Sequence, residues 1–402
     1  MSVRQEKDAC AASGMTRIKE NIGANQSADS SLDLGLRFIV EPSGPALTSD
    51  EAAILKELRP AGIMLRRRNF IQGEAYPGWL SSYKKLLDEV RFAIGRERIA
   101  VSVDHEGGKV HRFPPPITCF PYPAFYAAEP EAVTAVASAM ARELSALGVN
   151  VSFAPTADIH SNPANPVINQ RAFGSTVAQV SDAAIRFASA LRAGGITPCA
   201  KHFPGHGDTT TDSHTSLPTV NRTLAELEQR ELAPFAALIR EQVEMVMSAH
   251  IELPLVDPGV PATLSRKIMT GILRQKLGFT GVTIADALGM KGVSEKHAPG
   301  AVAIPAHKAG IDLMLMVGDS VSLRDALLAK RELEKFAESC SATDMKDIKE
   351  SQQRISTLLL KLPQPAVVLL DDGVLETHGK LASKLGANQQ WARFEFDPIG
   401  FT

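Results

Sequence analysis

The sequence lacks any long hydrophobic run and carries almost no net charge. A helix that spans a bilayer needs roughly 20 consecutive apolar residues, so no membrane span is expected. The formal net charge of -2 leaves no basic excess for binding nucleic acid or an anionic membrane surface. The 402 residues, of which 44% are hydrophobic, are instead typical of a globular protein with one large domain or two ordinary ones.

Cysteine is scarce as well. The four cysteines, Cys10, Cys119, Cys199 and Cys340, form no C-x-x-C pair. Scattered thiols in a chain of this length favour reduced cysteines in a cytoplasmic protein over a disulfide framework. Residues 1–34 are polar and lack the apolar core of a secretory signal, so we predict a disordered leader there. A cytoplasmic location is therefore expected.

Short apolar runs take the place of long ones, and longer amphipathic stretches separate them. The runs are continuous and not alternating, as expected for parallel strands that are buried on both faces. They occupy residues 36–40, 62–65, 99–103, 149–154, 196–200, 244–249, 281–285 and 311–316. Helix signals lie between them, and Thr223 and Glu226 have the spacing of a capping box that opens a helix.

Roughly eight strand–helix units of this kind predict an α/β fold, a (β/α)8 barrel. We assign the barrel and its C-terminal helices to residues 35–362 and a C-terminal extension without an assigned role to residues 363–402. A doubly wound open sheet is the main alternative. It is disfavoured because no glycine-rich fingerprint follows the first strand and because polar clusters follow many strands instead of one switch point.

Polar residues follow the predicted strands with unusual consistency, and in a barrel the carboxyl ends of the strands surround the active site. They are Asp104 and Arg112 after the third run, Asn165 and Arg171 after the fourth, Lys201 and His202 after the fifth, His250 after the sixth and Asp286 after the seventh. A ring of such residues indicates one pocket. Long donors beside short acceptors suit a polyhydroxylated ligand, whose oxygens both give and accept hydrogen bonds.

Residues 201–214 concentrate proton-transfer groups in a loop that glycine and proline shape. Asp212 and His214 lie two positions apart within it. A histidine titrates near pH 6.5 and can donate and recover a proton near neutrality, and a neighbouring carboxylate orients its ring. This pair is therefore a candidate acid/base.

An alternative interpretation of the same loop is a metal site, in which His202, His206 and Asp208 would be ligands together with Asp212 and His214. Metal-binding histidines usually have fixed spacing on helices or strands, whereas these straddle glycines and a proline. We therefore predict no metal, and we expect His206 and Asp208 to shape the turn. Glu106, beside two glycines, is expected to anchor its own turn.

Asp286 ends the seventh apolar run, where a strand would hold its carboxylate at the mouth of the barrel. It could cap the next helix or act as a nucleophile. Cleavage of a glycoside needs an ionised carboxylate at the anomeric carbon and a proton donor near the leaving oxygen. Because Asp212 and His214 can supply that donor, the nucleophile is the favoured interpretation.

Together these motifs resemble the family 3 glycoside hydrolases, in particular the branch of single-barrel β-N-acetylglucosaminidases. The match rests on residues 103–113, 165–168, 171–174, 201–214, 261–265 and 285–290, within roughly residues 35–320. The resemblance implies a retaining exo-glycosidase of the β-N-acetylhexosaminidase type that needs no cofactor. It implies N-acetylglucosamine-containing glycans as substrates, such as cell-wall muropeptides in peptidoglycan recycling. We expect a monomer or a weak oligomer.

The resemblance also implies residue roles. Asp286 would match the nucleophile that forms a glycosyl-enzyme, and His214, paired with Asp212, would match the acid/base. The residues that would grip the terminal sugar are Asp104, Arg112, Arg171, Lys201 and His202.

The sequence departs from the branch at Lys109, at Asn169–Gln170 and at Arg66–Arg68, where the run is more basic than usual. These positions bear on the aglycone more than on the reaction. Two other functions stay open. One is a phosphorylase, because a neutral histidine base repels incoming phosphate less than a carboxylate does. The other is a sugar-binding sensor without catalysis.

Overall fold

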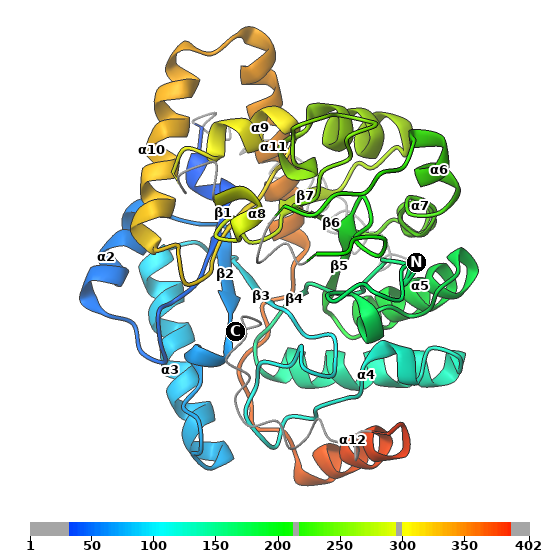
Figure 1. Cartoon of the computed structure of the whole chain (residues 1–402). Coiled ribbons are helices and arrows are strands. Elements are labelled where there is room, and N and C mark those ends of the chain that lie inside the picture. Colours follow the sequence, from blue (N-terminus) through cyan, green and yellow to red (C-terminus); the bar gives the residue numbers. More distant parts are fainter. Residues whose placement is uncertain (1–31, 212–216, 295–299, 387–402) are drawn as a thin grey trace, which may run out of the picture. The chain divides into compact units, whose positions relative to one another are not determined.

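The computed structural model describes residues 32–211, 217–294 and 300–386, and the account below concerns the unit that begins at Leu34. Eight parallel strands form one sheet, with helices outside it (Figure 1). The strands are β1 (Phe38–Val40), β2 (Gly62–Leu65), β3 (Ala100–Val103), β4 (Val151–Ser152), β5 (Thr197–Phe203), β6 (Met245–Ser248), β7 (Val282–Ala285) and β8 (Met314–Met316). The predicted (β/α)8 barrel is confirmed.

The strand order is β7-β6-β5-β4-β3-β2-β1-β8, so each strand lies beside its neighbours in the sequence. A parallel bridge between Ile284 of β7 and Leu313, the residue before β8, joins the two ends of the sheet into a ring. All carboxyl ends therefore face the same rim.

Each of the eight predicted runs contains a strand, with two differences in length. β4 has only two residues. Before it, the Asn150 side chain, and not a strand backbone, bonds to Val101 N–H and Ile99 O. After it, Pro155 has no N–H to donate to a neighbouring strand. β5 extends to Phe203, so Lys201 and His202 belong to the strand and do not follow it. The pairing of β5 with β6 shifts register between Ala200 and Phe203.

The helices fill the connections between strands and continue after β8. They are α2 (Ser49–Leu58), α3 (Tyr76–Ile94), α4 (Pro130–Ala146), α5 (Val177–Ala193), α6 (Leu224–Gln229), α7 (Ala233–Arg240), α8 (Lys291–Ser294), α9 (Ala303–Ala309), α10 (Leu323–Ser339), α11 (Ala342–Lys361), α12 (Asp372–Lys384) and a π-helix at Lys267–Lys276. The capping box expected at Thr223 and Glu226 opens α6. Within the described residues, no helix is both long and apolar enough to pass through a bilayer.

The core lies inside the barrel and under its amino-terminal end. Ile355, Leu358 and Leu359 of α11 are buried with side chains of the strands in one apolar cluster. At the same end Asp312 accepts from Arg274 (Nη2–Oδ2 2.5 Å) and Arg354 (Nη2–Oδ1 2.9 Å). The amino-terminal end of the barrel, covered by α11, therefore stabilises the fold, and the active site is expected at the opposite, carboxyl-terminal rim.

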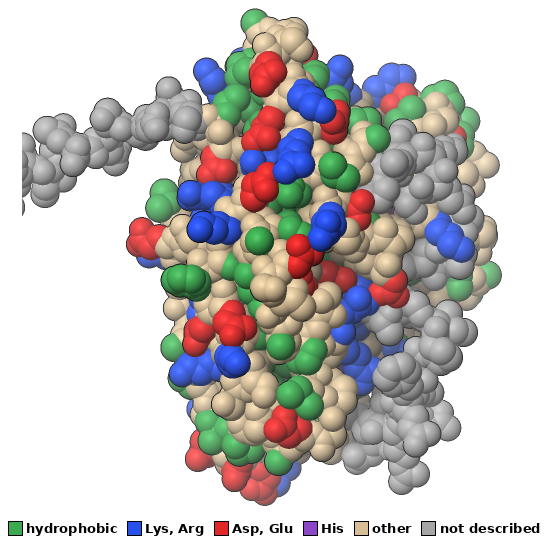
Figure 2. Space-filling model, turned by 90° about the vertical axis from the view of Figure 1, so that its left-hand side faces the viewer, with side chains coloured by type: hydrophobic (Ala, Val, Ile, Leu, Met, Phe, Trp, Pro, Cys, Tyr) green, Lys and Arg blue, Asp and Glu red, His purple; other side chains and the backbone are tan. Residues whose placement is uncertain are grey.

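The outer face over α2, α3 and α10 carries acidic and basic side chains that are interspersed (Figure 2). Two ion pairs, Arg324–Asp50 at 2.6 Å and Arg331–Glu57 at 2.7 Å, join α10 to α2. Exposed pairs of this kind contribute little to stability. Beyond α11, α12 lies against α4, where His378 Nδ1 is 2.7 Å from Glu143 Oε1.

Candidate active site

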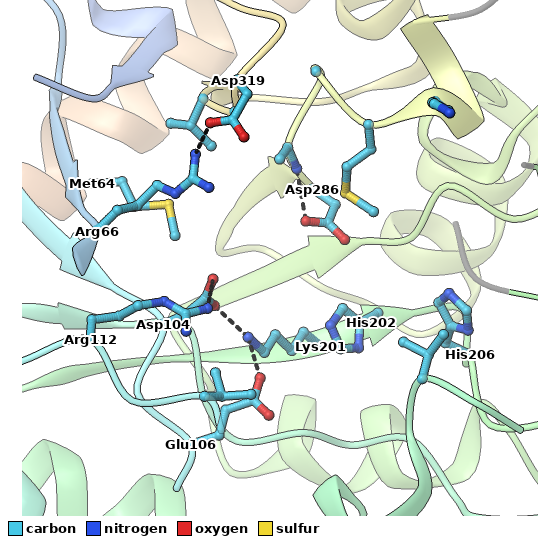
Figure 3. A pocket seen from close by; sticks show the side chains of 18 of the residues that line it. Met64, Arg66, Asp104, Glu106, Arg112, Lys201, His202, His206, Asp286 and Asp319 are labelled. Carbon is cyan, nitrogen blue, oxygen red and sulfur yellow. Dashed lines mark hydrogen bonds and ion pairs between the residues drawn. The ribbon is translucent and has the colours of Figure 1, made fainter. Parts of the chain in front are cut away.

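A cavity of about 500 Å³ opens at the carboxyl ends of the strands. It is lined by residues of β2 and β5 and by residues of the segments that follow β2, β3, β4, β5, β7 and β8 (Figure 3). Six residues singled out from the sequence meet there: Asp104, Arg112, Arg171, Lys201, His202 and Asp286. The fold thus brings together side chains that are up to 182 positions apart (286 − 104) in the chain.

Glu106 connects two of the expected sugar-gripping cations. Its carboxylate accepts from Arg171 through both oxygens (Nε–Oε2 and Nη2–Oε1, each 2.8 Å). Oε1 also lies 2.5 Å from Lys201 Nζ, which is 2.6 Å from Asp104 Oδ1. Glu106 therefore does more than anchor its own turn, because it ties the end of β5 to the loop after β4.

Charge pairing compensates the burial of this cluster. Burial alone would raise the pKa of Glu106, which is only 2% exposed, but the charges of Arg171 and Lys201 hold that pKa well below its usual range. Burial would lower the pKa of Lys201, but Asp104 and Glu106 raise it above its ordinary value. Both groups are therefore charged near neutral pH.

His202 is oriented from both ring nitrogens. Its Nδ1 lies 2.6 Å from Asp158 Oδ2, which can only accept, so Nδ1 carries the proton. Its Nε2 lies 3.2 Å from Arg171 Nη2, a group that can only donate. These contacts therefore fix the orientation of the ring, with Nδ1 directed at Asp158 and Nε2 beside Arg171.

Asp158 is a site residue that the sequence analysis missed. It is fully buried and accepts from the backbone N–H groups of His202 (3.1 Å) and His206 (2.6 Å) as well as from the His202 ring. Burial would raise its pKa, but His202 is the main influence that lowers it. Its sequence signal is an aspartate in a largely apolar segment shortly after the fourth predicted strand.

Asp286 extends from the end of β7 and lies across the cavity from Glu106 (Figure 3). Its Oδ1 accepts from the N–H of Ala287 at 2.7 Å, and its own N–H donates to Ser248 O at 3.2 Å. His250, expected in the pocket, is not among the residues that line the cavity. Its ring is buried, with Nε2 3.0 Å from Ala287 O, so it supports the peptide beside Asp286.

The first half of the loop after β5 carries His206 and Asp208, both of which were expected to shape the turn. His206 lines the cavity, and Nδ1 of its buried ring lies 2.8 Å from Thr209 Oγ1. Asp208 points to Arg222 and Arg230, each 2.9 Å from Oδ2. Asn165 donates to His206 O at 2.8 Å, so its side chain stabilises this turn and does not line the cavity.

Asp212 and His214, the expected acid/base pair, lie outside the described residues. The metal alternative included both of them. Among the residues that the structure does describe, there is no group of three or more histidine, cysteine, aspartate or glutamate side chains that could hold a metal ion.

Further lining residues were not expected from the sequence, namely Met64, Arg66, Met290, Lys291 and Asp319. Arg66 belongs to the unusually basic run after β2. Its Nη1 is 3.2 Å from each oxygen of Glu41 and 3.8 Å from Asp319 Oδ1. The neighbouring Arg68 forms an ion pair with Asp319 too.

A model of the N-terminal domain of glycosyl hydrolase family 3 matches residues 31–358. The chain belongs to glycosyl hydrolase family 3. The family and the glycoside hydrolase class predicted from the motifs are thereby confirmed.

Several relatives of the chain are named for one activity. The chain is 40% identical over 253 residues to beta-hexosaminidase A of Pseudoalteromonas piscicida, an alignment covering 59% of this chain and 42% of the relative. It is 37% identical over 278 residues to beta-hexosaminidase of Methylococcus capsulatus, covering 68% and 80%. The chain thus spans less than half of the first relative and most of the second.

The fold is similar to that of a family 3 β-N-acetylglucosaminidase from Paenibacillus sp. The TM-score is 0.78 at 32% sequence identity, and the match covers 88% of this chain and 67% of the other. Most of this chain is therefore similar in fold to a family 3 enzyme.

The Glu106 cluster predicts a loss of binding when its charge is removed. In Glu106→Gln, Arg171 and Lys201 lose their shared carboxylate, and kcat/KM for a family 3 substrate should fall about 10- to 100-fold. Because Glu106 raises the pKa of Lys201, the alkaline limb of the pH profile should also move to lower pH. Glu143→Gln, which removes a buried carboxylate outside the cavity, is the control. An unchanged alkaline limb in Glu106→Gln would contradict this role.

The buried histidines predict a loss of stability in acid. Burial and the neighbouring His202 lower the pKa of His206 to about 4, and burial lowers that of His111 to about 4. Because an unfolded histidine titrates near 6.5, the unfolded chain takes up a proton that the folded chain refuses, and stability falls as the pH drops from about 6.5 towards 4. His206→Asn should reduce the loss between pH 7 and pH 5 by about 2 kcal/mol in urea unfolding. His111→Asn should behave alike, and equal pH slopes in all three proteins would refute the assignment.

Proposed function

We propose that this chain is a retaining exo-β-N-acetylglucosaminidase that hydrolyses terminal, non-reducing N-acetyl-β-glucosaminides. The observation that carries the proposal is that Asp286 opens into the same cavity as a paired set of donors and acceptors around Lys201. Donors and acceptors in alternation suit the hydroxyl groups of a sugar. The names of the relatives, beta-hexosaminidase and β-N-acetylglucosaminidase, support the same substrate class.

In the proposed first step, the Asp286 carboxylate attacks the anomeric carbon. The bond from that carbon to the glycosidic oxygen breaks, a covalent glycosyl-enzyme forms, and the leaving oxygen takes a proton. The Ala287 N–H bond to Oδ1 fixes the direction of the carboxylate. In the second step water, deprotonated by the acid/base, attacks the same carbon and releases the sugar with its configuration retained.

We propose His214 as the acid/base and Asp212 as its orienting carboxylate. The support is their spacing in the sequence and the ordinary titration range of a histidine. The described residues that precede the pair are well held, since Asp208 is fastened by Arg222 and Arg230. The pair follows β5, the strand that carries Lys201 and His202.

The sugar would be gripped by Asp104, Arg112, Arg171, Lys201 and His202. These side chains are already paired with one another or with Glu106 and Asp158. Binding a ligand therefore costs little additional side-chain entropy. The cluster offers Lys201 and Arg171 as donors and Asp104 as an acceptor. Such an arrangement favours a ring with several hydroxyl groups over a simple anion.

For the natural substrate we propose muropeptides from peptidoglycan recycling, met in the cytoplasm. The support is the family resemblance together with the scattered thiols. The reaction should be hydrolysis and not phosphorolysis, so added phosphate should change neither the rate nor the product. Accumulation of a sugar 1-phosphate would favour the phosphorylase.

The nucleophile assignment predicts that Asp286→Asn abolishes turnover of an aryl N-acetyl-β-glucosaminide. Asparagine keeps the shape but cannot form the glycosyl ester, so kcat should fall by about 10⁴-fold or more. In Asp286→Ala, where the place of the carboxylate is empty, added azide should restore part of the rate by attacking the same carbon and releasing a glycosyl azide. Asp182→Asn, an exposed residue of α5, is the control. Activity near that of the parent protein in Asp286→Asn would exclude this nucleophile.

The acid/base assignment predicts a dependence on the leaving group. In His214→Ala, substrates with poor leaving groups should lose about 10²- to 10⁴-fold in rate, because they need the proton most. Activated aryl substrates should retain much of their rate of glycosyl-enzyme formation. The measurement is a series of aryl N-acetyl-β-glucosaminides with graded leaving-group pKa. A uniform loss across that series would exclude His214 as the acid.

A further inference from the structure

The segment after α11 is attached to the outside of the barrel. The match to the family 3 model ends at residue 358, and the chain continues past α11 to α12. Along the way Asn150 Nδ2 donates to Pro363 O at 2.9 Å, and the N–H of Val368 donates to Ala146 O at 2.8 Å. α12 then lies beside α4 (Figure 1). The reaction proposed above gives this part of the chain no role.

His378 connects α12 to the loop after β3. It is 8% exposed, and its Nδ1 lies 2.7 Å from Oε1 of Glu143, a fully buried residue of α4. The oxygens of Glu143 also accept from Thr118, from its N–H at 2.8 Å and from its hydroxyl at 2.6 Å. The His378 ring lies 6.5 Å, centroid to centroid, from the ring of Phe120. α12 therefore contacts this loop both through a shared carboxylate and through an aromatic ring.

The segment 118–121 of that loop packs behind the turn that carries Glu106. The N–H of Gly108 donates to Phe120 O at 2.7 Å. A Cβ on Gly107, whose φ is +102°, would lie 2.4 Å from a backbone oxygen of the same segment. Because turn and segment are in such close contact, a shift of the segment would shift the turn and the carboxylate of Glu106 with it.

We propose that α12 is a positioning element for the sugar-binding side of the cavity and that His378 is its positioning residue. The inference rests on the proposed function, because it assumes that Glu106 and its cations hold the sugar in place. The path runs from α12 through Glu143 and Thr118 to the turn that carries Glu106. Each of these side chains belongs to a residue at most 8% exposed, so a bond lost along the path is not cheaply replaced by water.

The alternative is that α12 only covers α4 and stabilises the fold. The two roles differ in their kinetic effect. A loosened Glu106 turn weakens the grip on the sugar but leaves Asp286 in place, because backbone groups of its own loop and of β6 hold that residue. KM should then rise while kcat is kept. A loss of stability alone would reduce the amount of active protein and leave KM unchanged.

The test uses the full chain, an aryl N-acetyl-β-glucosaminide as substrate and N-acetylglucosamine as a competitive inhibitor. His378→Leu keeps an apolar side chain beside Phe120 but loses the contact to Glu143. KM and the inhibition constant should both rise about fivefold, the effect of one hydrogen bond. The value of kcat should stay within about twofold of the parent's. Unchanged KM and inhibition constants in His378→Leu would overturn the inference.

Two conservative variants should keep both constants near those of the parent protein. In His378→Asn, the side-chain amide can donate to Glu143 from close to the position of Nδ1. In Glu143→Gln, the amide can accept from the N–H of Thr118 and donate to its hydroxyl. A rise in His378→Asn as large as that in His378→Leu would contradict the hydrogen-bonded path.

Thr118→Val removes the hydroxyl at the other end of the path and tests the inference even if His378→Leu does not fold. It should raise KM and the inhibition constant in the same way. In the double variant with His378→Leu, the rise should be smaller than the product of the two single effects, because both changes break one path. Effects that multiply fully would overturn the inference.

The matched control is Asp371→Ala. The Asp371 side chain caps α12 by accepting from the N–H of Gly373 at 2.9 Å, and it lies about two turns before His378. Its loss should weaken the helix and lower the unfolding midpoint in urea without raising KM. A rise in KM equal to that in His378→Leu would overturn the inference, because general loosening of α12 would then suffice.

Calorimetric binding of N-acetylglucosamine separates this inference from the proposed function, because it reports on the sugar-binding side without turnover. Absence of hydrolysis by the parent protein would overturn the proposed function. If that protein still bound the sugar, about fivefold weaker binding by His378→Leu would support the positioning role, and equal binding would overturn it. A parent protein that neither hydrolyses the substrate nor binds the sugar would overturn both.

Discussion

The ion cluster around the buried carboxylate of Glu106 is the interaction on which the rest of the site depends. An isolated charge in a protein interior is costly, and a buried pair is stable only when its geometry is good and its remaining hydrogen bonds are made. Glu106 meets that condition with two bonds from Arg171 and one contact to Lys201. Removing any member would leave at least one buried charge with one partner fewer, so the three side chains hold each other in place.

This cluster also couples segments that lie far apart in the sequence and beyond the ends of their paired strands. Glu106 follows β3, Arg171 lies in a 3-10 turn after β4, and Lys201 is in β5. Asp158 extends the coupling by holding His202 and the backbone of His206. Asp286 is held in a different way, by backbone groups of its own loop and of β6. A rigid binding side and a separately supported carboxylate are what a reaction at one carbon of a bound ring needs.

The sequence predicts the barrel well because buried parallel strands leave a strong local signal. Eight continuous apolar runs correspond to eight strands, and the polar residues at their ends meet because all carboxyl ends share one rim. Local sequence patterns do not show contacts between residues that are distant in the sequence. The buried partner Asp158 lies six residues past a two-residue strand, on a segment with no periodicity. Lys201 and His202 were placed after β5 because their polarity hides the continuation of the strand.

The wall that carries Arg66 could not be predicted for a related reason. Arg66 and Asp319 are far apart in the sequence, and they meet because β1 lies between β2 and β8 when the ring closes. Arg66 pairs with Glu41 and Asp319, whereas Lys201 and Arg171 pair with Asp104 and Glu106. A substitution after β2 or β8 can therefore alter the charge of one side of the cavity while the sugar-gripping cluster keeps its geometry. A barrel of this kind can change the partner to which its sugar is attached without rebuilding the part that binds the sugar.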